Sequence, residues 1–349
     1  MKILLIRLSS IGDCVMASSV VAALREAHPG AHIAWVVQSK SVGAVRGLEG
    51  VDEVFEWSDK NGRWRGFWQI ARQIRRAHFD VVVDLQGLDK AALFMLASGA
   101  KRRITGESAR RFPRKFATET VPEERKIHAR DFYFGRVAPL GIAPDVAERF
   151  FPILPIKAEH FEFATRFLTE NGVGSGDTIF GFNLGASVEV NRWAPENFAH
   201  LAFNLLKNPG AKVILFGAPA DTALLEEFQR SFAALNGEKT EPRVVVALGK
   251  TNLMQLAALS KKCECFLTAD TGPMHIAAAV GAPVLALFGP ARIWRTAPIQ
   301  NPANAEIRVL EASKITGTWP APMSAHSVES VEKAMLEMSA TKPENEVVA

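Results

Sequence analysis

The sequence predicts an α/β protein with two doubly wound domains, each built on a parallel sheet covered by helices. Short apolar runs of strand length alternate with helical segments along most of the chain, and the alternation restarts after a proline-containing segment at 150–155. With 349 residues the chain is long enough for two cores. We expect domains at 1–155 and 156–325, and a C-terminal piece, 326–349, whose helix packs back on the first domain before the tail frays.

In the first domain, the apolar runs predict strands and the amphipathic runs predict helices. The strands are expected at residues 2–8, 33–37, 51–55, 79–85 and 101–106, and the helices at 14–27, 67–77, 90–98 and 128–140. Residues 107–127 lack periodicity and are rich in charge, which indicates a loop that is mobile or ordered by a partner.

The second domain repeats the pattern after a helix at 158–170. Strands are expected at 178–183, 211–216, 243–248, 266–269 and 284–288, and helices at 195–206, 221–234, 253–260, 274–280 and from about 327 to 338. Polar turns follow several of these strands. The carboxyl ends of parallel strands are where open α/β sheets bind ligands, so these turns are the candidate site.

Composition indicates a cytoplasmic globular protein. Hydrophobic residues make up 48% and charged residues 22%, and no apolar run reaches the ~18 residues needed to cross a bilayer. The start, Met1–Arg7, reads as a first strand and not as a signal peptide. The three cysteines do not suggest a disulfide framework. Cys263 and Cys265 alternate on a predicted strand, which argues against a shared metal.

Positive charge is concentrated between residues 60 and 115, where fourteen Lys or Arg stand against four Asp or Glu. Trp57, Trp64, Phe67 and Trp68 lie among the first of them. Such a region suits an anionic partner: phosphorylated lipid headgroups, a membrane surface or nucleic acid. Any single group of neighbouring Lys and Arg residues in this region would indicate only a solvated helix face.

The turn Asp270–Pro273 is the strongest local signal. It follows a buried strand and opens a helix that carries His275, and a helix start presents N–H groups and a positive dipole end suited to phosphate. Asp270, Thr271 and His275 would then converge on one anion. The alternative is an ordinary capped turn without a ligand.

Gly12-Asp13 lies at the first strand–helix turn. The spacing of a dinucleotide-binding fingerprint is absent here. A lone carboxylate at this place fits a general base that accepts a hydroxyl proton during sugar transfer. It would equally fit the cap of the next helix.

Three more turns of the second domain could contact a nucleotide. In the segment 183–195, small residues would let the backbone and Ser187 approach an anion, and Arg192 could neutralise a diphosphate. The turns at 216–221 and 249–252 would receive the base and ribose. Asp221 could bind ribose hydroxyls, or it could serve as a cap.

Five segments together resemble a known family: Ser9–Asp13, Asp80–Lys90, Arg192-Trp193, Asp270–His275 and Phe288–Pro290. In this order and spacing they resemble glycosyltransferase family 9, the ADP-heptose:lipopolysaccharide heptosyltransferases, over nearly the full length. The early Ser-x-Gly-Asp combined with the late Asp-Thr-Gly-x-x-His is specific, whereas either alone would be weak.

The resemblance implies a GT-B fold, in which two Rossmann-like domains face each other across a cleft. It implies inverting, metal-independent transfer of heptose from ADP-L-glycero-D-manno-heptose to a 3-deoxy-D-manno-octulosonic acid (Kdo) or heptose residue of the lipopolysaccharide inner core. The first domain would bind the acceptor and the second the nucleotide sugar. We further expect no cofactor, a monomer without nucleic acid, and peripheral contact with the cytoplasmic face of the inner membrane.

Carried over by position and combined with the turns above, the resemblance makes Asp13 the base. The expected donor-binding residues are Ser187, Arg192, Thr251, Asp270, Thr271, Gly272 and His275, to which we add Asn191 and Asp221. The expected acceptor-binding residues are Ser10, Gly12, Arg63, Lys90, Arg110, Arg111 and His128. Asn191 stands where the family often has Lys, and Arg192 is expected to supply that charge. Ala291-Arg292 replaces the usual Thr-Asp/Asn.

Other interpretations stay open at this point. The chain could be a family 9 transferase with another nucleotide sugar or a later core acceptor, or a nucleotide-sugar 2-epimerase, which would leave the basic region unexplained. It could also be a non-catalytic protein that binds nucleotide sugar or the lipid A core. Nucleic-acid binding has only the charge in its favour.

Overall fold

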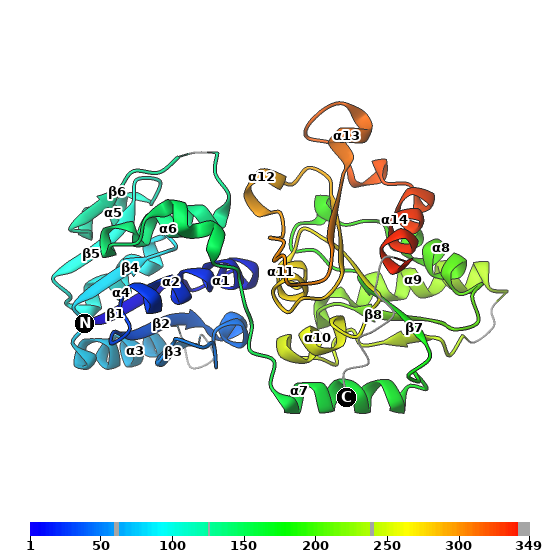
Figure 1. Cartoon of the computed structure of the whole chain (residues 1–349), viewed down its shortest axis with the longest axis horizontal. Helices are drawn as coiled ribbons and strands as arrows, with labels where there is room; N and C mark the ends of the chain where they lie inside the picture. The colour runs from blue at the N-terminus through cyan, green and yellow to red at the C-terminus, as the bar shows by residue number, and fades with distance from the viewer. Residues whose placement is uncertain (59–62, 125, 238–240, 341–349) are drawn as a thin grey trace. The chain divides into compact units, whose positions relative to one another are not determined.

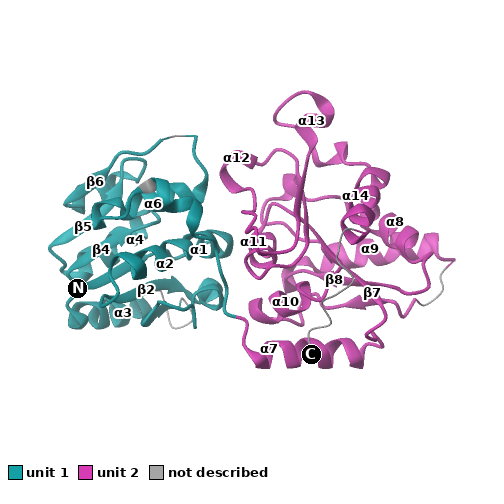
Figure 2. Cartoon of the chain, in the orientation of Figure 1, with its two compact units in different colours: residues 1–155 teal, residues 156–349 magenta. Residues whose placement is uncertain are grey.

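A computed structural model describes residues 1–58, 63–124, 126–237 and 241–340. The chain forms two compact units, Met1–Pro155 and Ile156–Ala349, drawn in different colours in Figure 2. The boundary falls at the end of the proline-containing segment, where the sequence predicted it. The expected cleft between the domains stays a prediction.

The first unit is a six-stranded parallel sheet in the order β3-β2-β1-β4-β5-β6 (Figure 1). Its strands are β1 (Lys2–Ile6), β2 (His32–Gln38), β3 (Glu53–Trp57), β4 (Val81–Asp84), β5 (Arg102–Gly106) and β6 (Glu119–Val121). Its helices are α1 (Ile11–Ala17), α2 (Ser19–Ala27), α3 (Arg63–Ala77), α4 (Asp89–Ser98), α5 (Arg111–Phe116) and α6 (Ala129–Val137).

Helices cover both faces of this sheet because the strands are apolar on both sides. Leu4 and Ile6 of β1 pack in one buried cluster with Phe67 of α3 and Phe94 of α4. Ile3 and Leu5 point to the opposite face by the two-residue period of a strand, and they are just as buried. The helix expected at 14–27 is interrupted at Ser18, where α1 ends and α2 begins.

The expectation of an irregular loop at 107–127 is wrong. This segment contains α5 and the edge strand β6, which pairs with β5. The apolar pattern did not show the strand because its residues are half-exposed or exposed. Side-chain hydrogen bonds to the neighbouring strand stabilise it instead. The guanidinium of Arg102 in β5 donates bonds of 2.7 and 2.9 Å to the two carboxylate oxygens of Glu119.

The second unit repeats the arrangement, with the strand order β12-β11-β10-β7-β8-β9 and all neighbours parallel. Its strands are β7 (Thr178–Asn183), β8 (Ala211–Phe216), β9 (Val244–Val246), β10 (Cys265–Ala269), β11 (Val284–Phe288) and β12 (Ile307–Glu311). Its helices are α7 (Ala158–Glu170), α8 (Pro195–Leu205), α9 (Thr222–Leu235), α10 (Leu253–Ser260), α11 (Gly272–Ala279), α12 (Ile293–Thr296), α13 (Ala312–Thr316) and α14 (Val328–Ala340). The edge strand β12 was not anticipated, because its five residues are all half-buried.

The C-terminal helix belongs to the second unit, so the expectation that it packs back on the first is wrong. Val331, Met335 and Met338 of α14 lie in the same buried cluster as the residues of β7, β8 and α8. Asn204 of α8 donates a 2.8 Å hydrogen bond to Glu332, and Figure 1 shows α14 beside α8. The apolar stripe of this helix identified it as amphipathic, but a stripe does not specify which surface it covers.

Each sheet has one place where the strand order reverses, and there the loops of two neighbouring strands diverge. In the first unit this switch point lies between β1 and β4, and in the second it lies between β10 and β7. Ligands of open α/β sheets bind outside the carboxyl ends of the strands at such points. The turns with Asp13 and with Asp270–Gly272 follow β1 and β10, so each lies at the switch point of its own sheet.

Candidate active site

Asp13 lies in the first turn of α1, three residues after the N-cap Ser10. Its Oδ2 accepts hydrogen bonds from the backbone N–H of Ser10, at 3.2 Å, and from the Ser10 hydroxyl, at 2.8 Å. The capping role that the sequence left open is therefore present. Asp13 is the acidic member of a capping box and not the N-cap itself.

Two distant side chains also reach Asp13. The guanidinium of Arg7, from the end of β1, forms an ion pair with Oδ2. The hydroxyl of Tyr133, from α6, donates a 2.7 Å hydrogen bond to Oδ1. The Arg7 guanidinium also lies over the Tyr133 ring, 5.4 Å from its centroid, so the three side chains form one cluster.

This cluster sets the protonation state of Asp13. Burial alone would raise the pKa of the carboxyl group, but the charge of Arg7 and the hydrogen bonds from Tyr133 and Ser10 outweigh it and hold the pKa below its ordinary value. Asp13 is thus a carboxylate at neutral pH. Among the described residues Oδ2 has two partner residues, Arg7 and Ser10, whereas Oδ1 has one, Tyr133; Oδ1 is therefore the oxygen better placed to accept a proton.

The end of β4 and the turn after it hold the segment from which Arg7 reaches Asp13. Asp84 is fully buried, and its carboxylate accepts hydrogen bonds from the backbone of Gln86 and Gly87 at 2.9 and 2.8 Å. Gln86 in turn accepts from the backbone of Leu8 at 2.8 Å, and Arg7 donates to the carbonyl of Leu85 at 3.0 Å. Burial raises the pKa of Asp84, against the effect of the Arg136 charge. These hydrogen bonds therefore hold Arg7 and Leu8, in the segment between β1 and the helix that carries Asp13.

The predicted acceptor residues are spread over several elements of the first unit. Ser10 contacts Asp13, and Gly12 is buried in α1. Lys90 lies over the Trp57 ring at 5.4 Å, Arg110 pairs with Asp89 at 3.2 Å, and His128 caps α6 by accepting from the backbone of Arg130. Arg63 begins α3, but its side chain lies outside the described residues.

Arg111 lines a cavity of about 820 Å³ beyond the carboxyl ends of β5 and β6. Its other basic residues are Arg114 and Lys115 of α5, and its remaining lining residues are Glu107, Ser108, Thr120 and Glu123. Glu123 is itself paired with Arg136 at 2.7 Å, so the charge facing the cavity is mainly positive. The cavity lies at the same sheet edge as Asp13 and has the charge to hold an anionic group.

In the second unit, α11 begins directly after the Asp270 turn. Thr271 is its extended N-cap residue and Gly272 and Pro273 are its first residues. The first N–H groups of a helix have no carbonyl partner within it, and they point along its positive end. His275, one turn further, is buried, and the carboxylate of Asp270 accepts a 3.1 Å hydrogen bond from Thr296 of α12.

The turn after β7 lies on the other side of the same switch point. Ser187 is exposed, Asn191 and Arg192 are half-buried, and Arg192 donates to the carbonyl of Ala186 at 3.3 Å. Asn183, which the sequence pattern did not mark as a site residue, links the turn after β7 to strand β10. Its buried amide donates to Gly185 O at 2.8 Å and to Thr268 Oγ1 of β10 at 3.2 Å.

The two remaining predicted donor residues lie on neighbouring strand ends. Asp221 accepts a 2.8 Å hydrogen bond from the backbone of Ala218 in the short 3-10 turn before α9, and its side chain makes no capping hydrogen bond to α9 itself. It also lies against Gly185, where an added Cβ would come within 2.3 Å of its carboxylate, so it contacts the turn after β7. Thr251 is half-buried and precedes Asn252, whose side chain caps α10.

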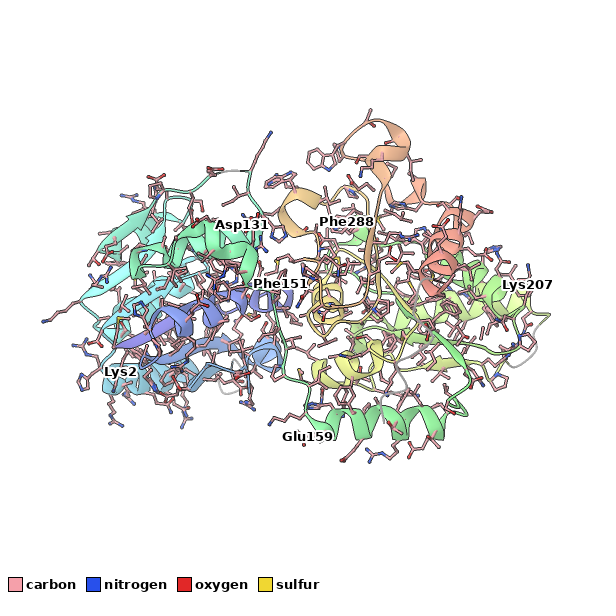
Figure 3. The ribbon with its side chains drawn as sticks, viewed as in Figure 1. Lys2, Asp131, Phe151, Glu159, Lys207 and Phe288 are labelled. Carbon is pink, nitrogen blue, oxygen red and sulfur yellow. The ribbon has the colours of Figure 1, made fainter. Side chains whose placement is uncertain are left out.

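The sequence pattern did not predict Arg7 and Tyr133 as partners of Asp13, because Arg7 comes from the end of the preceding strand and Tyr133 lies 120 residues away. One signal existed: Tyr133 is the only tyrosine of the chain. A second buried histidine, His326, has its Nε2 3.1 Å from the carbonyl oxygen of Phe288, labelled in Figure 3 at the end of β11. The carbonyl of His326 accepts from Trp193 at 3.0 Å.

Within the described ranges, no group of three or more His, Cys, Asp or Glu side chains is arranged to hold a metal ion. Cys265 opens β10, whereas Cys263 precedes the strand, and both are buried cysteines that form no disulfide. The helices of the described part of the chain include none that is long and apolar enough to cross a membrane.

Comparison with known proteins identifies similar sequences. The sequence model of glycosyltransferase family 9 (heptosyltransferase) matches residues 67–316, well over half of the chain. The lipopolysaccharide core heptosyltransferase OpsX of Haemophilus influenzae is 27% identical over 299 residues, which cover 85% of this chain and 81% of that protein.

Solved structures are similar over nearly their whole length. A family 9 glycosyltransferase from Veillonella parvula has a TM-score of 0.83 at 27% identity, covering 98% of this chain and 97% of the other. The E. coli ADP-heptose lipopolysaccharide heptosyltransferase II has a TM-score of 0.78 at 22% identity, covering 97% and 99%. These similarities confirm the expected GT-B fold.

Proposed function

Because the chain belongs to glycosyltransferase family 9, the heptosyltransferase family, we propose that it transfers heptose from ADP-L-glycero-D-manno-heptose to a Kdo or heptose residue of the lipopolysaccharide inner core. The transfer would invert the anomeric centre and need no metal ion. The observation that carries the proposal is the position of two chemically different groups: an ionised Asp13 and a helix start suited to phosphate each lie at the switch point of one sheet.

Asp13 is the proposed base. The acceptor hydroxyl would give its proton to Oδ1 while its oxygen attacks the anomeric carbon from the face opposite the ADP. The lowered pKa makes Asp13 a weak base, but it also ensures that the carboxylate is ionised at every pH near neutrality. Tyr133 and Arg7 would fix the direction of the carboxylate. They would also stabilise it before the proton arrives.

The donor diphosphate is proposed to lie at the second switch point. The N–H groups at the start of α11, with Thr271 and His275, would hold the oxygens that become negative as the sugar leaves, and Arg192 would add a positive charge from the turn after β7. Fixed dipoles and one cation can stabilise a departing diphosphate in place of a metal. Asp221 and Thr251 would contact the nucleoside, which extends toward β8 and β9.

The cavity beside α5 is the proposed place for an acidic group of the acceptor. Arg111, Arg114 and Lys115 offer it three cations at the sheet edge that carries Asp13. Kdo is a carboxylated sugar, and a phosphorylated lipid acceptor adds further negative charge. The acceptor would be reached by a monomer at the cytoplasmic face of the inner membrane.

The test is to incubate the protein with a panel of nucleotide sugars and truncated core acceptors, with and without EDTA, and to identify products by mass spectrometry. The proposal is supported if the wild-type protein adds one heptose from ADP-heptose in the presence of EDTA and the Asp13→Asn protein does not. Transfer from another donor would assign a different substrate within the family. Donor turnover that persists in the Asp13→Asn protein would show that Asp13 is not the base.

A further inference from the structure

The outer side of α3, α4 and α5 combines exposed apolar side chains with positive charge, and we refer to it as the α3–α5 face. Its large apolar residues are Trp64, Trp68, Leu93, Leu96 and Phe112, with exposed fractions of 63, 57, 37, 41 and 56%. By contrast α1, α2 and α6, which cover the opposite face of the same sheet and are fully described, have no exposed large apolar side chain. The asymmetry shows that one face alone carries the apolar surface.

The three helices form one continuous layer. Phe67 of α3 and Phe94 of α4 pack with ring centroids 5.0 Å apart under that layer. The Arg75 guanidinium of α3 lies against Gly99 at the end of α4. Arg110, at the start of α5, pairs with Asp89 of α4. The apolar side chains therefore belong to one surface and not to three separate ones.

The charge of this layer is strongly one-sided. Between them the helices α3, α4 and α5 contain nine Lys or Arg residues and one acidic residue, Asp89, which is already paired with Arg110. Along α3, residues four apart lie on one side of the helix. On this side Trp64 and Trp68 are followed by the exposed Arg72 and Arg76. The aromatic rings thus continue directly into a row of cations.

We infer that the α3–α5 face docks on an anionic lipid bilayer. Tryptophan is favoured at the level of lipid headgroups, aliphatic side chains favour the acyl boundary beneath it, and arginine and lysine are attracted to acidic headgroups. A single-stranded nucleic acid would also suit cations and aromatic rings, but Leu93 and Leu96 offer no ring on which a base could stack. Docking would bring the edge of the sheet with Asp13 near a lipid-anchored acceptor; that consequence rests on the proposed function, whereas bilayer binding does not.

The experiment is sedimentation of the full chain with sucrose-loaded vesicles. Vesicles of phosphatidylethanolamine with phosphatidylglycerol provide negative charge, and phosphatidylcholine vesicles provide the neutral reference. The charge variant is Arg65→Gln/Arg72→Gln/Arg76→Gln, and the apolar variant is Trp64→Ala/Trp68→Ala. The matched control, Lys261→Gln/Lys262→Gln/Lys333→Gln, removes the same charge from exposed lysines of the second unit.

We expect wild-type protein to bind the anionic vesicles and to release them in high salt. Each arginine lost should lower the partition coefficient about fivefold, so the charge variant should lose roughly a hundredfold. The apolar variant should bind the anionic vesicles more weakly than wild type at low salt, because its arginines remain but its interfacial rings are lost. The control should bind like wild type. Transfer to a truncated water-soluble acceptor should be unchanged in all three variants, which separates a failure of docking from a failure of the proposed function.

Three results would overturn the inference. Wild-type protein could fail to bind anionic vesicles, or the control could lose as much binding as the charge variant, which would show only diffuse attraction. The third is binding of a single-stranded oligonucleotide that is tighter than vesicle binding and is lost in the charge and apolar variants. Circular dichroism and the melting temperature of each variant check that it is folded.

Discussion

The two switch-point turns of this protein occupy equivalent places in equivalent sheets but are built from different groups. The first turn presents a carboxylate, Asp13, held by side chains from the end of β1, the start of α1 and α6. The second presents the beginning of α11, where Thr271, Gly272 and Pro273 place backbone groups at the helix end. In the proposed function these two constructions suit two different tasks on one architecture. Accepting a proton requires a side chain with a tuned pKa, whereas holding a diphosphate requires fixed donors and little side-chain bulk.

The largest effect should come from the carboxylate itself. Asp13→Asn keeps the shape and the hydrogen bond from Tyr133 but removes the base, so turnover should fall by roughly 10²–10⁴. ADP affinity, measured by calorimetry, should stay near the wild-type value, because the proposed donor site lies on the other unit. Turnover close to that of wild type would remove Asp13 from the mechanism.

Substitution of His275, by contrast, is expected to change the affinity for ADP. His275→Ala should weaken ADP binding by about tenfold, since hydrogen bonds to charged groups contribute more than neutral ones. The matched control is His200→Ala, an exposed histidine of α8. Equal ADP affinity in wild type and His275→Ala would assign the buried imidazole to packing.

Tyr133→Phe tests how the base is tuned. Its hydroxyl stabilises the ionised form of Asp13 and lowers the pKa of that carboxyl. Removing the hydroxyl raises the pKa, so the fall of kcat/KM on the acid side should move to higher pH by about one unit. The pH profile of kcat/KM measures this. If kcat/KM of the variant is lower at every pH but falls at the same acidic pH as in wild type, Tyr133 has a structural role alone.

The smallest effect is expected at His326, which contacts neither turn. Burial lowers the pKa of this histidine, against the hydrogen bond to Phe288. A histidine with a depressed pKa is neutral in the folded protein, and the unfolded chain takes up its proton first. Stability should therefore be full above the ordinary histidine pKa and fall as pH decreases below it, by at most ~1.4 kcal/mol per pH unit.

Urea unfolding of wild type and His326→Gln between pH 5 and 7.5 would measure that dependence, with His200→Gln as the control for an exposed imidazole. The His326 variant should unfold more easily at neutral pH but lose less stability on acidification. An identical pH slope in both proteins would mean that other groups cause it.

The sequence was sufficient for most of the fold, because strand and helix periods are local properties. The alternation of apolar runs predicted ten of the twelve strands and the boundary at Pro155. It missed β6 and β12, edge strands whose residues are half-exposed or exposed and so show no continuous apolar run. It misplaced α14 because an amphipathic stripe indicates burial but not against which partner.

The same division holds for the candidate site. The places of Asp13, Thr271, Gly272 and His275 after β1 and β10 could be predicted, because strands and helix starts are local features; their roles stay predictions. The pairing of Asp13 with Arg7 and Tyr133 could not, since Tyr133 lies 120 residues away and reaches the carboxylate only when α6 packs beside α1. The sequence by itself determined which polar groups follow the strands. Only the tertiary structure decided the direction of the pKa shift of Asp13 and how many partners each of its oxygens has, because both depend on neighbours that folding brings together.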